Sequence, residues 1–87
     1  MDEETFEARP KQHVFWQSPA PERCDFSGTP IDNEFVDGHV PGDRRWGCFH
    51  PGIYKQCGGT LGTGWGQRYV KQPEGTPLAG RWLKVEG

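Results

Sequence analysis

The stretch from Trp46 to Tyr69, WGCFHPGIYKQCGGTLGTGWGQRY, decides how this chain folds. It holds two of the three cysteines, two of the four tryptophans, both tyrosines and seven glycines. Glycine adopts positive φ without steric cost, so this density of glycine predicts tight turns and close approaches of the backbone. Thiols beside tight turns are typical of a metal-binding knuckle, and a metal knuckle is therefore the first hypothesis that the stretch supports.

The composition outside this stretch predicts one small, mainly β domain. A chain of 87 residues holds a single domain, and only 32% of its residues are hydrophobic, many of them aromatic. The 13 glycines and 8 prolines disfavour long helices and favour a turn-rich β fold. We therefore expect a small β-rich domain whose core is made mostly of aromatic rings.

The same composition limits the cellular setting. No apolar run is long enough for a membrane span or for the core of a signal peptide, so we expect no membrane partner and use in a reducing cytoplasm. Three cysteines cannot all pair within one chain, which favours metal ligation or free thiols over a disulfide framework. The net charge of −2 gives no overall attraction to nucleic acid.

Residues 1–22 read as an extended arm ahead of a domain over residues 23–87. The arm begins with acidic residues and contains three prolines, which favour extended backbone. Its apolar residues gather at Phe15 and Trp16. This pair either covers the domain's own core or inserts into a neighbouring protein, and we expect it to be the docking point for a partner. Removal of residues 1–21 is then expected to leave the remaining domain folded.

Local patterns predict the elements of the domain. Asp37-Gly38 between apolar residues is the signal of a two-residue hairpin turn joining Glu34–Val36 to His39–Val40, which Pro41-Gly42 ends. A tight turn is expected over residues 24–28, a short helical turn over 53–57, strands over 67–72 and 81–85, and a loop over 73–80.

A structural zinc site needs four Cys or His ligands, usually in two close pairs. The chain offers Cys24, Cys48, His50 and Cys57, so a zinc site is arithmetically possible. The spacing is irregular, because Cys48 and His50 are separated by one residue and Cys57 lies far from both. Free cysteines also pack as small hydrophobic residues. Zinc binding and a fold without metal both remain open.

Three runs carry a family resemblance: CDFSGTPIDNEFVDG (24–38), HPGIYKQCGGTLGTGWGQRYVKQ (50–72) and GRWLKVEG (80–87). They resemble a group of small zinc-ribbon-like proteins of tailed-phage genomes, whose pattern is CxxCGxPI, FVDG, a Trp, CxxC and GxGLGTGxGQxY, ending near WxKVEG. The resemblance covers roughly the chain from Cys24 to Gly87. It implies zinc-ribbon-like β-hairpins and places the four metal ligands at Cys24, Ser27, His50 and Ile53. Two of these four are not zinc ligands, so the resemblance implies a ribbon whose metal site has decayed.

Other chemistries fit the sequence poorly. The glycines at 62, 64 and 66 lack the Lys-Ser/Thr pair and the long helix that complete a phosphate-binding loop. A cysteine nucleophile needs an activating histidine in a pocket, and nothing in the sequence marks one. We therefore expect no enzymatic activity.

A basic segment lies between Asp43 and Glu74, where no acidic residue occurs. Aromatic rings between these positive charges suit single-stranded nucleic acid, with Trp46, Phe49, Tyr54, Trp65 or Tyr69 as stacking platforms. The phosphate contacts would come from Arg44, Arg45, Arg68 and Lys71. The alternative is a packed ribbon with solvated charges, in which Trp46, Trp65 and Trp82 pack around the glycine-rich turn.

The expected function is therefore that of a non-enzymatic phage protein that binds other proteins. The favoured setting is an accessory structural or assembly component, such as a capsid- or tail-associated virion protein. A nucleic-acid-binding regulatory ribbon and a phage inhibitor of a host protein are the alternatives. Each of these places the chain in the virion or in the host cytoplasm, with zinc as a hypothetical cofactor.

Overall fold

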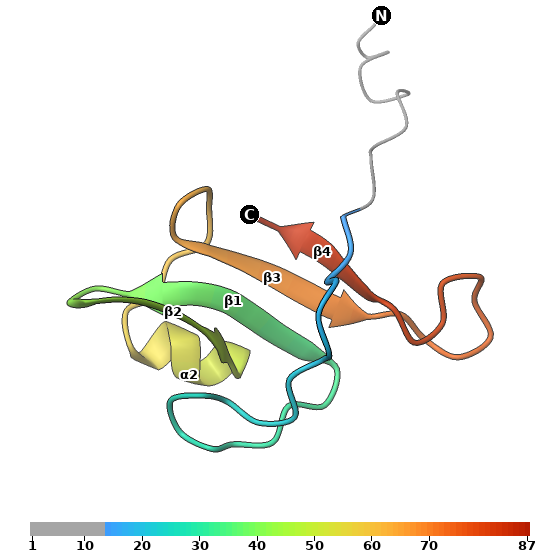
Figure 1. Cartoon of the computed structure of the whole chain (residues 1–87), viewed down its shortest axis with the longest axis horizontal. Helices are drawn as coiled ribbons and strands as arrows, with labels where there is room; N and C mark the ends of the chain where they lie inside the picture. The colour runs from blue at the N-terminus through green and yellow to red at the C-terminus, as the bar shows by residue number, and fades with distance from the viewer. Residues whose placement is uncertain (1–13) are drawn as a thin grey trace, which may run out of the picture.

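A computed structural model describes residues 14–87, which form one open antiparallel sheet and a short helix (Figure 1). The elements are β1 (Glu34–Val40), β2 (Asp43–Phe49), α2 (Pro51–Gln56), β3 (Gly66–Lys71) and β4 (Trp82–Glu86). The strand order across the sheet is β2-β1-β3-β4. The expected small β-rich fold class is confirmed.

The hairpin turn predicted at Asp37-Gly38 is wrong. Both residues lie inside β1, where Asp37 pairs with Cys48 of β2 and with Gln67 of β3. The chain turns instead at Pro41-Gly42, where Gly42 has a φ of +89°. Gly38 is needed for a different reason, because a Cβ at this position would lie 2.7 Å from the carbonyl oxygen of Trp65. The glycine of the Asp37-Gly38 dipeptide therefore marks a close approach of β1 to the Trp65–Gly66 backbone and not a turn.

The remaining predicted elements agree with the structure. The strands expected over 67–72 and 81–85 correspond to β3 and β4, each displaced by one residue. The helical turn expected over 53–57 is α2, which begins earlier because Pro51 suits the first turn of a helix. His50 caps this helix, since its Nδ1 accepts a hydrogen bond of 3.0 Å from the Gly52 N–H. The turn over 24–28 closes with a 2.8 Å bond from the Gly28 N–H to the Cys24 carbonyl.

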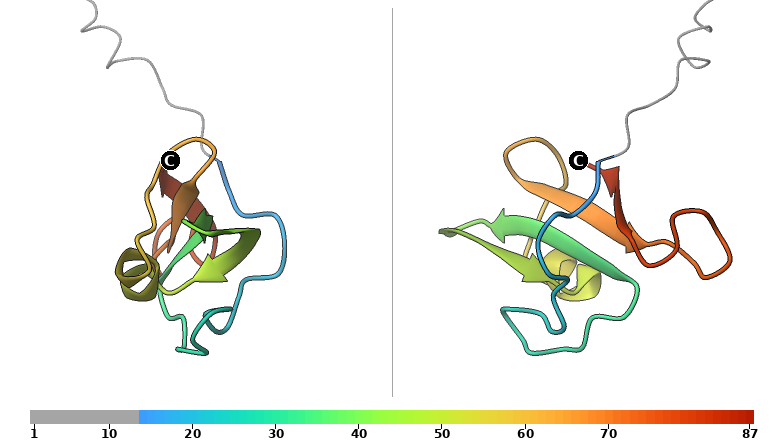
Figure 2. Two further views of the ribbon diagram at one scale, coloured as in Figure 1. Left: turned by 90° about the vertical axis from the view of Figure 1, so that its left-hand side faces the viewer. Right: turned by 45° about the vertical axis from the view of Figure 1, so that its right-hand side comes forward.

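The sheet has a separate core on each face. On one face, residues of α2 cover β1 and β2, in a cluster whose buried members are Cys24, Val36, Phe49 and Tyr54. On the other face, Trp16 and Trp82 pack against the cluster of Ile31, Phe35 and Tyr69. Figure 2 shows α2 and the N-terminal segment, drawn in blue, on opposite sides of the sheet. Phe35 is completely buried, because Trp16 and Trp82 pack on it in the second core.

The N-terminal segment extends the sheet and fills its second core. Lys84 N–H donates to the Val14 carbonyl at 2.8 Å, and Trp16 N–H donates to the Trp82 carbonyl at 3.0 Å. The ring of Phe15 lies under the Arg81 guanidinium, 3.8 Å from the ring centroid. Phe15 and Trp16 therefore belong to the folded domain. Of the two alternatives for this pair, the structure has the intramolecular one, and the part of the arm over residues 1–13 lies outside the described residues.

Candidate binding face

Three rings form a ladder across adjacent strands on the face opposite α2. His39 of β1 stacks on Trp65, with ring centroids 4.9 Å apart and an angle of 18° between the ring planes. Trp46 of β2 contacts the same histidine at 5.2 Å and 53°. We call these three residues the aromatic ladder. Stacked and tilted rings at such distances attract one another beyond the area that they bury.

Backbone and side-chain hydrogen bonds fix the ladder in place. The His39 N–H donates to the Trp65 carbonyl at 3.0 Å, and His39 Nε2 donates to the Gly64 carbonyl at 2.9 Å. Beneath them, the Tyr54 hydroxyl lies 3.0 Å from the carbonyl oxygens of both His39 and Trp65. The hydroxyl is also 2.8 Å from the Thr60 carbonyl. These bonds hold His39 and the backbone of Trp65 in place, and the Trp46 ring lies against His39.

The two tryptophans of the ladder are exposed, whereas the other rings expected to stack on bases are not. Trp46 keeps 48% and Trp65 44% of its surface in water. Phe49, Tyr54 and Tyr69 are buried in the two cores. The expectation that Trp46, Trp65 and Trp82 pack together around the glycine-rich turn is wrong, because Trp82 packs against Phe35 in the second core.

A shallow pocket adjoins the ladder at the turn between β1 and β2. It has a volume of about 320 Å³, and Pro41, Arg44 and Trp65 are among its lining residues. Within residues 14–87, the Arg44 side chain takes part in no hydrogen bond or ion pair. The pocket therefore has an apolar ring on one side and an uncompensated positive charge on another.

The other arginines expected to contact phosphate are already paired. Asp43 holds Arg45 through two side-chain bonds of 3.0 and 2.9 Å, and these bonds lower the pKa of Asp43 to about 2. Arg68 lies between Glu34, at 2.9 Å, and Glu86, at 2.6 Å. Arg68 pairs across the sheet with Val36 and so lies on the face that carries α2. The four predicted basic residues, which include the exposed Lys71, do not form one phosphate-binding surface.

Asp37 is a half-buried carboxylate on the same face as the ladder. It lies two residues before His39 on β1, so both side chains point to the same side of the sheet. No side-chain hydrogen bond or ion pair to it is found in the described part of the chain. Burial raises the pKa of Asp37, and its charge in turn contributes to the raised pKa values of Cys48 and Tyr69. An unpartnered, partly desolvated charge is costly and is typical of a functional position.

Replacing Asp37 by asparagine is expected to stabilise the protein at neutral pH. A carboxyl group whose pKa is raised by folding favours the folded state below its unfolded-state pKa, and this contribution is lost as the pH rises through the folded-state pKa. Ionised Asp37 is therefore unfavourable at neutral pH, and Asp37→Asn removes the charge while keeping the shape. Thermal unfolding should show a higher midpoint for the variant at neutral pH and a smaller difference at about pH 3.

Asp32 supplies the matched control. Asp32→Asn removes the same charge, but from an exposed carboxylate instead of a half-buried one. A gain of stability by Asp32→Asn as large as that by Asp37→Asn would show that net charge, rather than desolvation of Asp37, is responsible.

The four residues expected to bind zinc do not converge. Cys24 is buried on the α2 face, whereas Cys48 packs against the core on the other face. His50 uses Nδ1 to cap α2, and Cys57 ends the same helix. Within residues 14–87, no group of three or more Cys, His, Asp or Glu side chains is placed to hold a metal ion. Zinc binding by this ligand set therefore stays a prediction.

The positions that the ribbon resemblance assigns to ligands lie close together instead. Burial alone raises the pKa of Cys24, but hydrogen bonds from the Ser27 hydroxyl and from the backbone of His50, Ser27 and Phe26 bring it below its usual value. Ile53 packs against the same cluster as Cys24. Hydroxyl and alkyl side chains do not bind zinc. The turn over residues 24–28 and the start of α2 are therefore joined by hydrogen bonds to the Cys24 sulfur and by apolar packing of Ile53.

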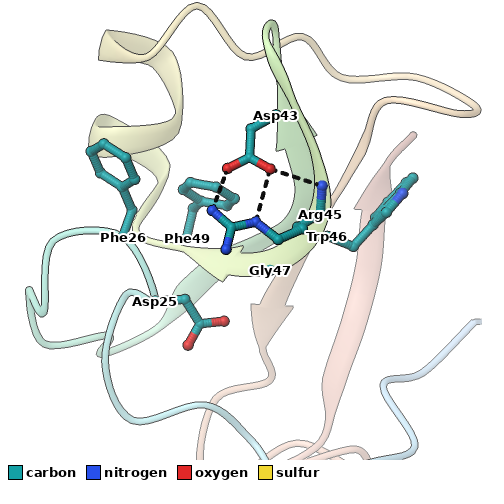
Figure 3. A pocket seen from close by; sticks show the side chains of 7 residues that line it. All are labelled: Asp25, Phe26, Asp43, Arg45, Trp46, Gly47 and Phe49. Atoms are coloured by element: carbon teal, nitrogen blue, oxygen red, sulfur yellow. Dashed lines mark hydrogen bonds and ion pairs between the residues drawn. The ribbon is translucent and has the colours of Figure 1, made fainter.

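A second hollow lies on the other side of β2 (Figure 3). It measures about 240 Å³ and lies between Phe26, which is 65% exposed, and the Asp43–Arg45 pair. Its remaining carboxylate is also engaged, because Asp25 Oδ2 accepts a 2.9 Å bond from the Cys48 N–H. Figure 3 shows the Trp46 ring and the Arg45 guanidinium pointing away from β2 in opposite directions. The charged groups of this hollow are therefore paired, whereas Asp37 and Arg44 on the ladder face are not paired within residues 14–87.

Sequence reasoning missed the ladder as a unit. Trp46 and Trp65 were both candidates for stacking, but His39 was assigned only to a hairpin strand. The available signal was the alternation along β1, which places Asp37 and His39 on one face once Gly38 is read as a strand residue. The pairing that brings Trp46 and Trp65 to either side of His39 has no local signature.

None of the helices within residues 14–87 has the length and apolar character needed to cross a membrane. Comparison with known proteins gives no match to a family model, to a curated protein or to a solved structure.

Proposed function

We propose that this chain is a non-enzymatic binding module that holds another protein against the aromatic ladder. The observation that carries the proposal is the pair of half-exposed tryptophans, Trp46 and Trp65, whose rings both contact His39 on one face of the sheet. Tryptophan and arginine dominate the binding energy of protein interfaces, and rigid side chains lose little entropy on binding. Arg44 and Asp37, whose side chains are not paired within residues 14–87, supply charged groups beside these anchors.

The reactivity of the cysteines supports the non-enzymatic part of this proposal. Burial, together with the nearby Asp37, Asp25 and Cys24, raises the pKa of Cys48 to about 12, so its thiol stays protonated at neutral pH. Cys24 has a lowered pKa but only 3% of its surface is exposed. Neither thiol has the combination of exposure and thiolate character that a nucleophile needs.

The setting of this module rests on the family resemblance. Because the sequence resembles small tailed-phage proteins, we place it as an accessory virion or assembly component, associated with a capsid or a tail. Inhibition of a host protein would use the same binding face. Nucleic acid is the weaker alternative, since Arg45 and Arg68, two of the four residues expected to contact phosphates, are already paired with carboxylates.

Quantitative affinity capture from phage-infected cells tests the proposal. The wild-type chain is compared with the double variant Trp46→Ala/Trp65→Ala and with Val85→Ala, which removes an apolar side chain that is 42% exposed. We expect the wild type and Val85→Ala to retain the same one or few proteins. The captured amount of these proteins should be at least about tenfold lower with the double variant, as loss of a hot spot predicts. Circular dichroism verifies that each variant is folded.

Nuclease treatment and a salt series separate the alternatives. Retention that disappears after nuclease, or that falls steeply with salt on single-stranded DNA, would replace protein binding by nucleic-acid binding. Equal capture by the wild type and the double variant would exclude the ladder as the binding face.

A further inference from the structure

Resting on the proposed function, we infer that the partner presents an extended segment with a basic residue, a proline and an acidic residue, the two charges about three residues apart. Asp37 receives the basic residue, Arg44 receives the acidic one, and the proline lies against Trp65 between them.

Within residues 14–87, no side chain donates a hydrogen bond to the Asp37 carboxylate, although Gln67 lies opposite it on β3. This carboxylate is half-buried beside Cys48 and Tyr69, and neither residue donates to it. A lysine or arginine of a partner supplies both the missing donor and the opposite charge. Charge-assisted hydrogen bonds of this kind are stronger than those between neutral groups.

At the other end of the face, Arg44 lacks a carboxylate partner within residues 14–87. Asp43 is the nearest carboxylate in sequence, but both of its oxygens are bound to Arg45 at 2.9 to 3.0 Å. Arg44 therefore faces the pocket without a counter-ion from residues 14–87. A carboxylate from the partner completes this end.

The pocket at the Arg44 end, on the side of Trp65, suits a proline ring. Its walls include Trp65, His39 and the Pro41 ring, and it has a volume of about 320 Å³. The Asp43 oxygens are occupied by Arg45, so this carboxylate has little capacity left to accept from a backbone N–H in the pocket. Proline has no N–H to leave unsatisfied. Segments rich in proline are also preordered, and they bind in grooves lined with aromatic rings.

The sheet geometry sets the spacing of the charges. Asp37 and Val40 are three residues apart on β1, and Val40 pairs with Asp43, the residue before Arg44, with a register shift between Gly38 and Val40. At about 3.3 Å per strand residue, the two ends lie about 10 Å apart along the strand. A polyproline II segment rises about 3.1 Å per residue and covers this length in about three residues.

Selection from a display library of random peptides tests the inference. The wild type, Asp37→Asn, Arg44→Glu and the control Val85→Ala are used as targets in parallel. The wild type and Val85→Ala should enrich peptides with a proline between a basic and an acidic residue, in either chain direction. Arg44→Glu should replace the acidic preference by a basic one, and Asp37→Asn should lose the basic preference while keeping the acidic one.

Three results would overturn the inference. One is enrichment of the same peptides by all four targets, and another is enrichment without a charge pattern. The third is quenching of tryptophan fluorescence by an oligothymidylate but by none of the enriched peptides, which would assign the face to single-stranded nucleic acid. If capture of a protein in cells still depends on Trp46 and Trp65, only the ligand class fails; if that capture also fails, the proposed function fails with it.

Discussion

Alanine at Gly38 is expected to destabilise the protein by about 3 kcal/mol or more, at the upper end of the cost of overpacking a core. A Cβ on Gly38 would lie 2.7 Å from the Trp65 carbonyl oxygen, 2.8 Å from the Gly66 Cα and 2.9 Å from the Tyr54 hydroxyl. Two of these atoms are backbone of the neighbouring strand, so relief requires β1 and β3 to separate. A domain of this size has about 4–13 kcal/mol of stability in total. Urea unfolding followed by tryptophan fluorescence measures the loss.

Gly59→Ala tests the same packing from the other side. Gly38, Gly59 and Gly66 surround the Tyr54 side chain, and a Cβ on Gly59 would lie 2.5 Å from atoms of the Tyr54 ring. Gly52→Ala is the matched control, because Gly52 lies in α2, where alanine is favoured over glycine, and its Cβ would be 3.3 Å from His50. If Gly59→Ala costs as much in a Tyr54→Leu background as alone, the Tyr54 ring is not what the glycines accommodate.

These glycines show what the sequence supported and what it did not. The density of glycine between Trp46 and Tyr69 predicted close backbone approaches, and Gly59 and Gly66 are such approaches. The partner, Tyr54, was not predictable, because it reaches them from the helix that follows β2. The same limitation explains the wrong turn at Asp37-Gly38, since a local dipeptide signal carries no information about a side chain brought in by tertiary packing.

The binding face was less predictable than the fold. Local residue preference placed β3 and β4 within one residue, whereas it divided β1 by a turn and did not predict β2. The aromatic ladder depends on how β1, β2 and β3 pair. Whether Asp37 and Arg44 have an ion-pair partner depends on which side chains the fold brings next to them. Arg45 and Arg44 are adjacent and chemically identical in the sequence, yet only Arg45 is bound by Asp43. Charge pairing of this kind is decided by side-chain direction, which composition does not give.

Truncation of Trp16 is the second large effect that we expect, at about 2–3 kcal/mol. Full burial of tryptophan makes its loss cost about 3–5 kcal/mol, and Trp16 is half-buried, so the smaller figure applies. Its ring meets Phe35 at 5.1 Å and Tyr69 at 5.4 Å, both edge to face, and its Nε1 donates to the Pro19 carbonyl at 3.1 Å. Trp16→Ala thus opens the second core to water.

Thermal and urea unfolding should therefore rank Trp16→Ala well below Trp16→Phe, which keeps an aromatic edge against Phe35. The control Phe26→Ala removes a ring that is 65% exposed and should change stability by less than about 0.5 kcal/mol.

The interpretation of residues 1–22 as a separate arm predicts that a chain lacking residues 1–21 stays folded. The contacts of Trp16 and the sheet bonds of Val14 predict the opposite, because that truncation removes one wall of the core around Phe35. Native stability in the truncated chain would return Phe15 and Trp16 to the role of a docking point for a partner.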